Sequence, residues 1–233
     1  KFDQEYSCSF QGSSGTLISG SKLKSLVHET PLNQKEGFYQ YQMPDKTKSY
    51  VMVCDVSEGK GLDYSTIQVI DVSKMPYNQV ATFRSNLITP TDFASKIHLI
   101  GKLYNEASCL IEINSIGETV AYILHNDFEY PNILRTENAG RLGKKITHKM
   151  GKTIDNGIKM SVQTKATGCS LLKLIVEADQ LILNDHNTIE ELSRFSRKGR
   201  SYEAESGSHD DLIMPLVSFA WLTDQRYFKE YTD

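Results

Sequence analysis

The chain has 233 residues, of which 39% are hydrophobic and 24% are charged, and its formal net charge at pH 7 is -3. A chain of this length can bury a substantial core, as one large domain or as two small ones. The composition is that of an ordinary globular protein and argues against a membrane protein, because no stretch approaches the roughly 20 apolar residues of a membrane-spanning helix.

The cysteines argue against a zinc site, because no CxxC pair occurs among Cys8, Cys54, Cys109 and Cys169. Two of them, Cys54 and Cys109, fall inside apolar runs, where a free thiol behaves as a small hydrophobic group. This pattern favours a reducing, cytoplasmic setting.

The first residues, "KFDQEYSCSF", contain neither an initiator Met nor the features of a signal peptide, so we expect a fragment of a longer protein. Residues 1–45 are rich in Ser, Gly, Gln and Lys, and we interpret them as a connector or edge segment before a main domain at 46–233. The segment "GTLISGSK" is not a phosphate-binding loop, since Ser21 separates Gly20 from Lys22.

From residue 49 onward the hydrophobic pattern predicts regular elements. Strands are expected over 50–55, 65–72 and 79–85, and the short links between them indicate an antiparallel meander. A helix over 91–105 with Thr91 as its N-cap, a strand over 108–115, a helix over 117–127 and a fifth strand over 132–136 follow.

The second half of the chain continues the alternation of helices and strands. The expected elements are a helix over 167–178, a strand over 180–183, a helix over 187–192, a hairpin over 193–204 and a closing helix over 209–228 that is either broken or entered awkwardly at Pro215. This order predicts an α/β fold with a mixed sheet, in which an antiparallel meander is followed by parallel strands and helices flank the sheet.

Several acidic residues stand where hydrophobic patterning alone does not require them. Asp55 ends the first predicted strand, and Asp210 and Asp211 open the closing helix; a turn residue and helix caps are the plain alternatives for these three. Glu112 interrupts the apolar run "CLIEI", and a buried carboxylate needs a cation, a metal or an opening to water.

These acids form a metal-binding hypothesis if the two strands that carry Asp55 and Glu112 are neighbours in the sheet. A closing helix packed on that sheet then brings Asp211 to the same point. Carboxylates at such close range repel one another unless a divalent ion neutralises them, and hard oxygen ligands suit Mg²⁺ or Mn²⁺.

A basic stretch lies between Arg135 and Lys173, which contains nine Lys or Arg residues against two acids, a local charge of +7. The plain alternative is a solvated loop face. The other is a phosphate-binding strip formed by Lys144, Lys145, Lys149 and Lys152, because clustered cations displace the counterions of a nucleic acid.

Three segments in this order, "CDVSEGKGLDYSTIQVID", "LIEINSIGETVA" and "ESGSHDDLIMPLVSFAWL", resemble the C-terminal nuclease domain of the large terminase subunit of tailed bacteriophages, particularly the T-even-like type. The resemblance is weak over the first 45 residues and strong from residue 49 onward. It implies an RNase H-like fold, shared with resolvases and integrases. It also implies a divalent-metal-dependent endonuclease that cuts concatemeric double-stranded DNA during headful packaging.

The resemblance also implies the roles of individual residues. It matches the metal-binding acids to Asp55, Glu112 and Asp211, with Asp210 as the alternative to Asp211. It places Asp63 near the metals. It gives His209 a catalytic supporting role, for which a capping or packing histidine is the alternative. The implied cofactor is Mg²⁺ or Mn²⁺, as two ions, one activating a water and the other stabilising the leaving oxygen.

The implied partners are double-stranded DNA, the portal and the small terminase subunit. The N-terminal ATPase domain of the same protein, which is absent here, is a further implied partner. The implied location is the host cytoplasm, at the prohead. Two rival hypotheses stay open: a non-catalytic DNA-binding or translocation module whose acids are structural caps, and a junction resolvase-like nuclease on the same fold.

Overall fold

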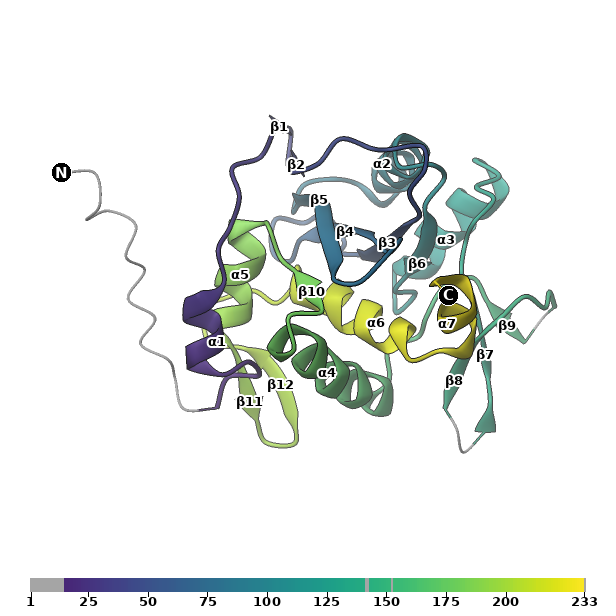
Figure 1. Cartoon of the computed structure of the whole chain (residues 1–233). Helices are drawn as coiled ribbons and strands as arrows, with labels where there is room; N and C mark the ends of the chain where they lie inside the picture. The colour runs from purple at the N-terminus through teal and green to yellow at the C-terminus, as the bar shows by residue number, and fades with distance from the viewer. Residues whose placement is uncertain (1–14, 141–142, 152, 233) are drawn as a thin grey trace.

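The computed structural model describes residues 15–140, 143–151 and 153–232 (Figure 1). The centre of this part of the chain is a mixed seven-stranded sheet. Its strands are β1 (Asn33–Lys35), β2 (Phe38–Gln40), β3 (Tyr50–Asp55), β4 (Ser65–Asp71), β5 (Tyr77–Ser85), β6 (Ser108–Ile111) and β10 (Leu181–Ile182). The strand order is β1–β2–β5–β4–β3–β6, and β10 lies beside β5.

The central strands form where the sequence is rich in apolar and β-branched residues. The first five residues of β3 and all seven residues of β4 are buried, as expected for strands that are covered on both faces. Strands β3, β4 and β5 form the predicted antiparallel meander, and β6 lies parallel to β3. The predicted mixed sheet is therefore confirmed.

The segment expected as a connector or edge contributes two of the strands. β1 and β2 pair with each other, and β2 pairs antiparallel with β5, with Gln40 opposite Ala81. Residues 33–40 therefore extend one edge of the main sheet. The first 14 residues lie outside the described residues.

Helices cover both faces of the sheet (Figure 1). They are α1 (Gly20–Ser25), α2 (Pro90–Leu103), α3 (Gly117–Asn126), α4 (Val162–Glu177), α5 (His186–Ser193), α6 (Ile213–Thr223) and α7 (Arg226–Thr232). On one face Met52 and Cys54 of β3 share a core with α2 and α3, whereas on the other face Val51 and Val53 share a core with α4 and α6. The alternation of side chains along a strand builds these three layers.

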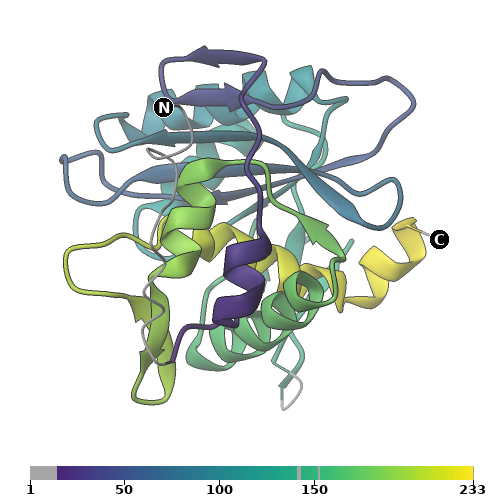
Figure 2. The same ribbon diagram turned by 60° about the vertical axis from the view of Figure 1, so that its left-hand side comes forward.

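Helix α6 packs directly on the sheet, with α4 outside it (Figure 2). Every residue from Ile213 to Leu222 is buried, and a helix that is hydrophobic all round belongs inside a protein. Pro215 lies in the first turn of α6, where the missing N–H has no partner to lose. The predicted helix over 209–228 is therefore wrong at its start and in its continuity, because α6 begins only at Ile213 and a break at 224–225 precedes α7.

Two further predictions need correction. The N-cap of α2 is Thr89, not Thr91: the Thr89 side chain accepts a hydrogen bond from the Asp92 N–H, and Pro90 occupies the first turn. The strand expected over 132–136 does not join the main sheet. Strand β7 begins at Arg135 and belongs to a separate small sheet, while Ile133 forms only an isolated bridge to Cys109.

The two smaller sheets lie outside this core. One is the hairpin of β11 (Phe195–Lys198) and β12 (Ser201–Ala204), which turns after Lys198 as predicted. The other joins β7 (Arg135–Asn138) to β8 (Lys144–Thr147) and β9 (Ile154–Asp155). Among the described residues, no helix has both the length and the apolar character that crossing a membrane requires.

Candidate metal centre

A pocket of about 440 Å³ lies at the carboxyl end of β3. It is bordered by the loop between β3 and β4, the turn before α3 and the residues before α6. Its lining includes four of the predicted site residues, Asp55, Asp63, Asp210 and Asp211. Acids that are 156 positions apart at the extremes therefore meet in one cavity.

Asp55 and Glu112 come together because β3 and β6 are parallel neighbours. The register pairs Cys54 with Ile111, so the next residue on each strand is an acid. The main-chain N–H of Glu112 donates to the Cys54 carbonyl at 2.9 Å. One oxygen of the Asp55 carboxylate accepts from the Val56 N–H at 2.8 Å. The sheet thus presents two carboxylates side by side at its carboxyl edge.

Asp210 and Asp211 lie just before α6 rather than inside it. The Asp210 carbonyl accepts from the N–H groups of Ile213 and Met214, so Asp210 closes the first turn of the helix with its backbone. The Asp211 residue is only 8% exposed. An oxygen of its carboxylate, Oδ2, accepts from the Tyr64 N–H at 3.1 Å. Both side chains remain available to the pocket.

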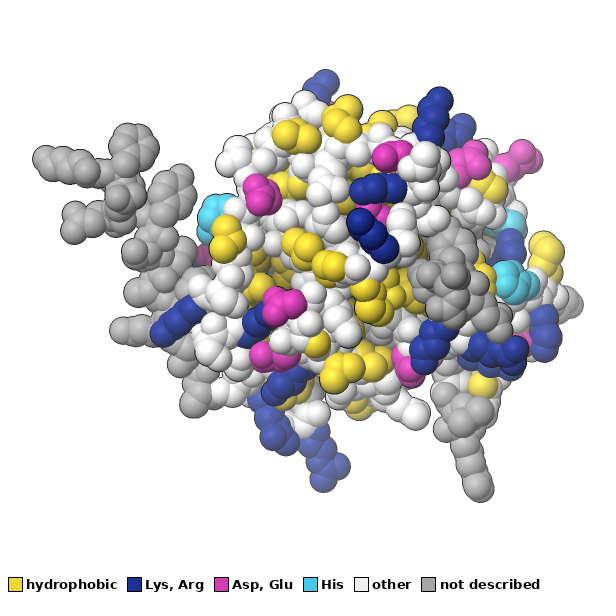
Figure 3. Space-filling model, viewed as in Figure 1, with side chains coloured by type: hydrophobic (Ala, Val, Ile, Leu, Met, Phe, Trp, Pro, Cys, Tyr) yellow, Lys and Arg dark blue, Asp and Glu magenta, His cyan; other side chains and the backbone are white. Residues whose placement is uncertain are grey.

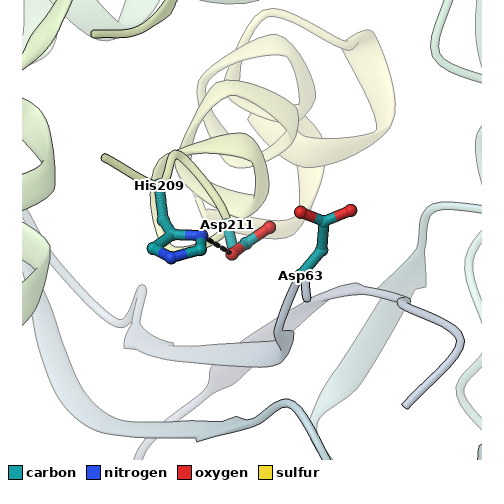
Figure 4. A group of neighbouring side chains, drawn as sticks. All are labelled: Asp63, His209 and Asp211. Carbon is teal, nitrogen blue, oxygen red and sulfur yellow. Dashed lines mark ion pairs between the residues drawn. The ribbon is translucent and has the colours of Figure 1, made fainter. Parts of the chain in front are cut away.

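Asp63, which lines the pocket, and His209, which lies outside its lining, flank Asp211 (Figure 4). One ligand atom each from Asp63, His209 and Asp211 lie within 4.8 Å of one another. The His209 Nδ1 is 3.3 Å from Asp211 Oδ2, and the His209 ring packs edge-on against the Tyr64 ring. These three side chains, two exposed and one buried, form the tightest group of potential ligands among the described residues.

The pKa values of Asp55, Glu112 and Asp211 show that these acids lack enough compensating positive charge. Burial, and then the charges of Glu112 and Asp211, raise the pKa of Asp55 well above its usual range. Burial raises the pKa of Glu112 to about 7, against the opposing effect of Lys165 and with a further increase from Asp210. Burial also raises the pKa of Asp211, although the Tyr64 N–H and His209 oppose it. The carboxylates therefore need protons or an added cation to coexist.

The donor set fits a divalent cation. Carboxylate oxygens are the hard ligands that Mg²⁺ and Mn²⁺ prefer, and a single imidazole is compatible with Mn²⁺. A doubly charged ion in the pocket would relieve the repulsion that raises the pKa of Asp55. The three cysteines within the described residues, Cys54, Cys109 and Cys169, are buried in the core and do not line the pocket.

The lysines of the basic stretch lie on the small sheet of β7, β8 and β9. Lys144 Nζ is 2.6 Å from Asp155, and Lys145 Nζ is 3.0 Å from Glu137. Lys149 Nζ is 3.5 Å from Glu137. Lys152 lies outside the described residues. The space-filling view shows Lys and Arg side chains gathered at the lower right, over these strands (Figure 3). The lysine side chains of Lys145 and Lys149 are the more exposed, at 53% and 71%.

Sequence reasoning missed two contributors to the site. Tyr64 holds Asp211 through its main-chain N–H and packs on His209 through its ring. Lys165 of α4 faces Glu112 and opposes the increase in its pKa. A main-chain donor leaves no mark in a sequence, whereas Lys165 is visible there as one of the nine cations of the basic stretch.

Comparison with known proteins places this fold. A profile of the Terminase RNaseH-like domain family matches residues 52–219. The large terminase nuclease of thermophilic phage G20c with bound cobalt has a TM-score of 0.68 at 19% identity, covering 92% of this chain and 100% of that chain. The G20c nuclease with bound magnesium gives 0.67 at 17% identity, with coverages of 92% and 100%.

A third structure, the large terminase nuclease domain of Thermus phage P74-26, has a TM-score of 0.58 at 19% identity and covers 87% of this chain and 92% of that chain. At these identities the likeness shows a shared fold. The profile match spans well over half of the sequence. The chain therefore belongs to the Terminase RNaseH-like domain family, which confirms the predicted RNase H-like fold and the predicted relation to terminases.

Proposed function

We propose that this domain hydrolyses phosphodiester bonds of double-stranded DNA at the pocket lined by Asp55 and Asp211, with Glu112 next to Asp55 and with a divalent metal as cofactor. One observation carries the proposal. Asp55 at the end of β3, Glu112 directly after β6 and Asp211 before α6 are acids whose pKa values burial raises, and the charges of Glu112 and Asp211 raise the pKa of Asp55 further. Such an arrangement is costly for a scaffold and useful for binding a cation.

The metal-binding residues in this proposal are Asp55, Glu112 and Asp211, with Asp63 beside Asp211 and Asp210 as the alternative to Asp211. The cofactor is Mg²⁺ or Mn²⁺, as two ions. When bound, the ions supply Lewis acidity to the phosphate and to a water molecule. The relative with bound magnesium supports this choice of cofactor.

His209 has the supporting role in this proposal. Its Nδ1 lies 3.3 Å from the Asp211 carboxylate, and its ring is fixed against Tyr64. Such an imidazole orients the carboxylate and can carry a proton at its other nitrogen.

The DNA duplex extends from the pocket toward the small sheet of β7, β8 and β9. Lys145 and Lys149 contact backbone phosphates, because their side chains are the exposed ones of the predicted strip. Lys144, which is 20% exposed and paired with Asp155, holds the sheet together. Lys152 belongs to the same proposed strip. Phosphate contacts grip DNA with little regard to its sequence, which suits headful cutting.

In this proposal the domain works inside a packaging motor of a T-even-like phage, in the host cytoplasm at the prohead. Residues 1–45 are the connector toward an N-terminal ATPase domain, and residues 46–233 are the nuclease domain. The portal and the small terminase subunit are the further partners, and the substrate is concatemeric DNA. The order of the three sequence segments that resemble this type of terminase supports the lineage.

The test is cleavage of supercoiled plasmid by the purified domain. With Mg²⁺ or Mn²⁺ we expect nicked and linear products, and with EDTA we expect none. Asp55→Asn should abolish cleavage, whereas Asp127→Asn, at an exposed acid after α3, should cleave like the wild type. A wild-type protein that binds DNA but never cuts it with either metal would support the non-catalytic module instead.

A further inference from the structure

Three buried side chains hold the main chain at Asp211 and Leu212. The Thr66 hydroxyl donates to the Asp211 carbonyl at 2.6 Å, and Gln68 Nε2 donates to the Leu212 carbonyl at 3.0 Å. The Leu212 N–H donates to Glu191 Oε2 at 2.8 Å. All three side chains belong to residues that are at most 7% exposed. The peptide that carries Asp211 is therefore fixed on both sides by the protein interior.

These contacts take the place of the side-chain cap that is common at the start of a helix. The N-cap of α6 is Leu212, which offers no capping side chain. Asp211, directly before it, directs its carboxylate to the Tyr64 N–H instead of to the helix. The sheet and α5 supply from outside the hydrogen bonds that position the start of α6. The Asp211 side chain is therefore not used as a helix cap and lines the pocket.

Strand β4, which carries Thr66, also links Asp211 to Asp55. Thr66 lies opposite Asp55 in the β3–β4 ladder and holds the Asp211 carbonyl with its side chain. A change in the Thr66 contact therefore moves Asp211 relative to Asp55.

Behind these contacts lies a buried polar network. Gln79 Nε2 donates to Gln68 Oε1 at 2.7 Å, and the amide of Gln68 also donates to the Thr188 hydroxyl at 3.1 Å. The Thr188 N–H and hydroxyl both donate to Asp185. Polar groups in a core cost free energy unless every one of them is paired, and in return they fix one geometry. Apolar side chains would pack α6 on β4 without specifying this geometry.

We propose that Thr66 and Gln68 are positioning residues of the metal centre, which set the place of the Asp211 carboxylate through the main chain of Asp211 and Leu212. The inference rests on the proposed function, since it assigns Asp211 to the metal. Neither side chain touches the metal or the DNA. Their effect is on the affinity of the site for the ion, as is known for side chains that orient metal ligands.

The test measures Mn²⁺ binding to the purified domain by calorimetry, without DNA and without reference to cleavage. Thr66→Val keeps the shape and removes the hydroxyl, and we expect it to weaken Mn²⁺ binding about tenfold. Thr66→Ser restores the hydroxyl and should bind Mn²⁺ within about twofold of the wild type. Gln68→Met removes the donor to Leu212 and should act in the same direction as Thr66→Val.

The matched control is Tyr130→Phe. The Tyr130 hydroxyl is also buried and also donates to a carbonyl, that of Ala107, at 2.7 Å, but at the other end of β6. This variant should lose stability comparably and bind Mn²⁺ like the wild type. Thr66→Val and Gln68→Met proteins that are folded and keep wild-type affinity would overturn the inference. A wild-type domain that binds no Mn²⁺ would overturn the proposed function itself.

Discussion

Gly117, the first residue of α3, packs directly on the carbonyl of Glu112. A Cβ built on Gly117 would overlap the Glu112 carbonyl oxygen and touch the Val56 side chain. The main-chain φ of Gly117 is not in the left-handed region, so space and not conformation requires glycine here. The turn between β6 and α3 therefore closes tightly behind a proposed metal ligand.

We predict that Gly117→Ala displaces Glu112 and reduces both the rate of cleavage and the stability of the fold. Overpacking of this kind costs about 1–3 kcal/mol of unfolding free energy, and a displacement of about 1 Å in an active site can cost roughly 100-fold in rate. Plasmid cleavage and urea denaturation of the same preparation give the two values. Gly20→Ala is the matched control, because Gly20 also begins a helix and a Cβ there meets nothing within 4 Å. Equal activities of the two variants would contradict the prediction.

Asp55 should be a destabilising residue when no metal is bound. Burial and the charges of Glu112 and Asp211 raise its pKa, so the ionised form costs the folded protein free energy at every pH above the unfolded pKa of about 3.9. Asp55→Asn should therefore be at least as stable as the wild type in EDTA, although it cannot cleave DNA. Its gain in melting temperature should grow as the pH rises above about 4 toward the raised pKa of Asp55 in the folded protein.

The same comparison in Mn²⁺ should reverse the order. A ligand that binds only the folded state stabilises it by mass action, and we expect this increase in melting temperature for the wild type but not for Asp55→Asn. A variant that is less stable than the wild type in EDTA at both ends of the pH range would show that Asp55 is a structural residue. It would then act as the turn former of the plain alternative.

The sequence predicted that Asp55 and Glu112 come together only if their two strands are neighbours in the sheet, which the structure shows. Both follow apolar runs of buried-strand length, and the helix between the meander and the second run required a parallel crossover. The observed register places the two acids one residue beyond Cys54 and Ile111. The N-cap of α2 was also within reach, because Pro is favoured in the first turn of a helix and Pro90 therefore indicates Thr89 rather than Thr91.

Other features depend on contacts that only the folded chain creates. Asp63 lies in a loop, and His209 and Asp211 lie in the segment before α6, so their close approach depends on loop conformation. Loops lack the hydrophobic periodicity from which helices and strands are predicted. A charge count along 135–173 shows nine cations, but the pairing of Lys145 with Glu137 follows from the cross-strand register of β7 and β8. Register of a short hairpin is set by its turn, which the sequence of the basic stretch does not specify.

Lys48 and Asp71 give the fold a pH-dependent contact remote from the metal centre. Lys48 Nζ is 2.7 Å from Asp71 Oδ2, and the Asp71 side chain is 9% exposed. Burial alone would raise the pKa of Asp71, but hydrogen bonds from Lys48 and Ser73 outweigh it and hold this pKa below its usual value. The hydrogen bond with Asp71 raises the pKa of Lys48.

We predict that Lys48→Gln lowers the unfolding free energy by roughly 1 kcal/mol at neutral pH. The contribution of Asp71 is present above its unfolded pKa of about 3.9 and is lost as the pH falls through its lower folded pKa. The contribution of Lys48 is present below about 10.4 and is lost as the pH rises through its higher folded pKa. The difference between wild type and variant in urea denaturation should therefore shrink at both extremes. Lys46→Gln, at an exposed lysine nearby, should show no such profile, and a difference that is constant with pH would refute the role of the pair.

The ion pairs of the small sheet divide the basic strip into two kinds of lysine. Lys144 is largely covered and bound to Asp155, so its replacement should destabilise the sheet. Lys145 and Lys149 share Glu137 and extend into solvent, and each can exchange that partner for a phosphate. Because each phosphate contact contributes about 0.9 to the slope of log K against log salt, we predict that Lys145→Gln with Lys149→Gln makes this slope less steep by roughly 2.

The slope is best measured by fluorescence anisotropy with duplex DNA in an Asp55→Asn background, so that no cleavage interferes. Lys198→Gln supplies the matched control, since Lys198 is an exposed hairpin lysine that faces Glu203 at 3.3 Å on the other small sheet. Its slope should equal that of the background protein. If the double variant also kept the background slope, Lys145 and Lys149 would be the solvated lysines of an ordinary hairpin, and the duplex would have to leave the pocket along a different face.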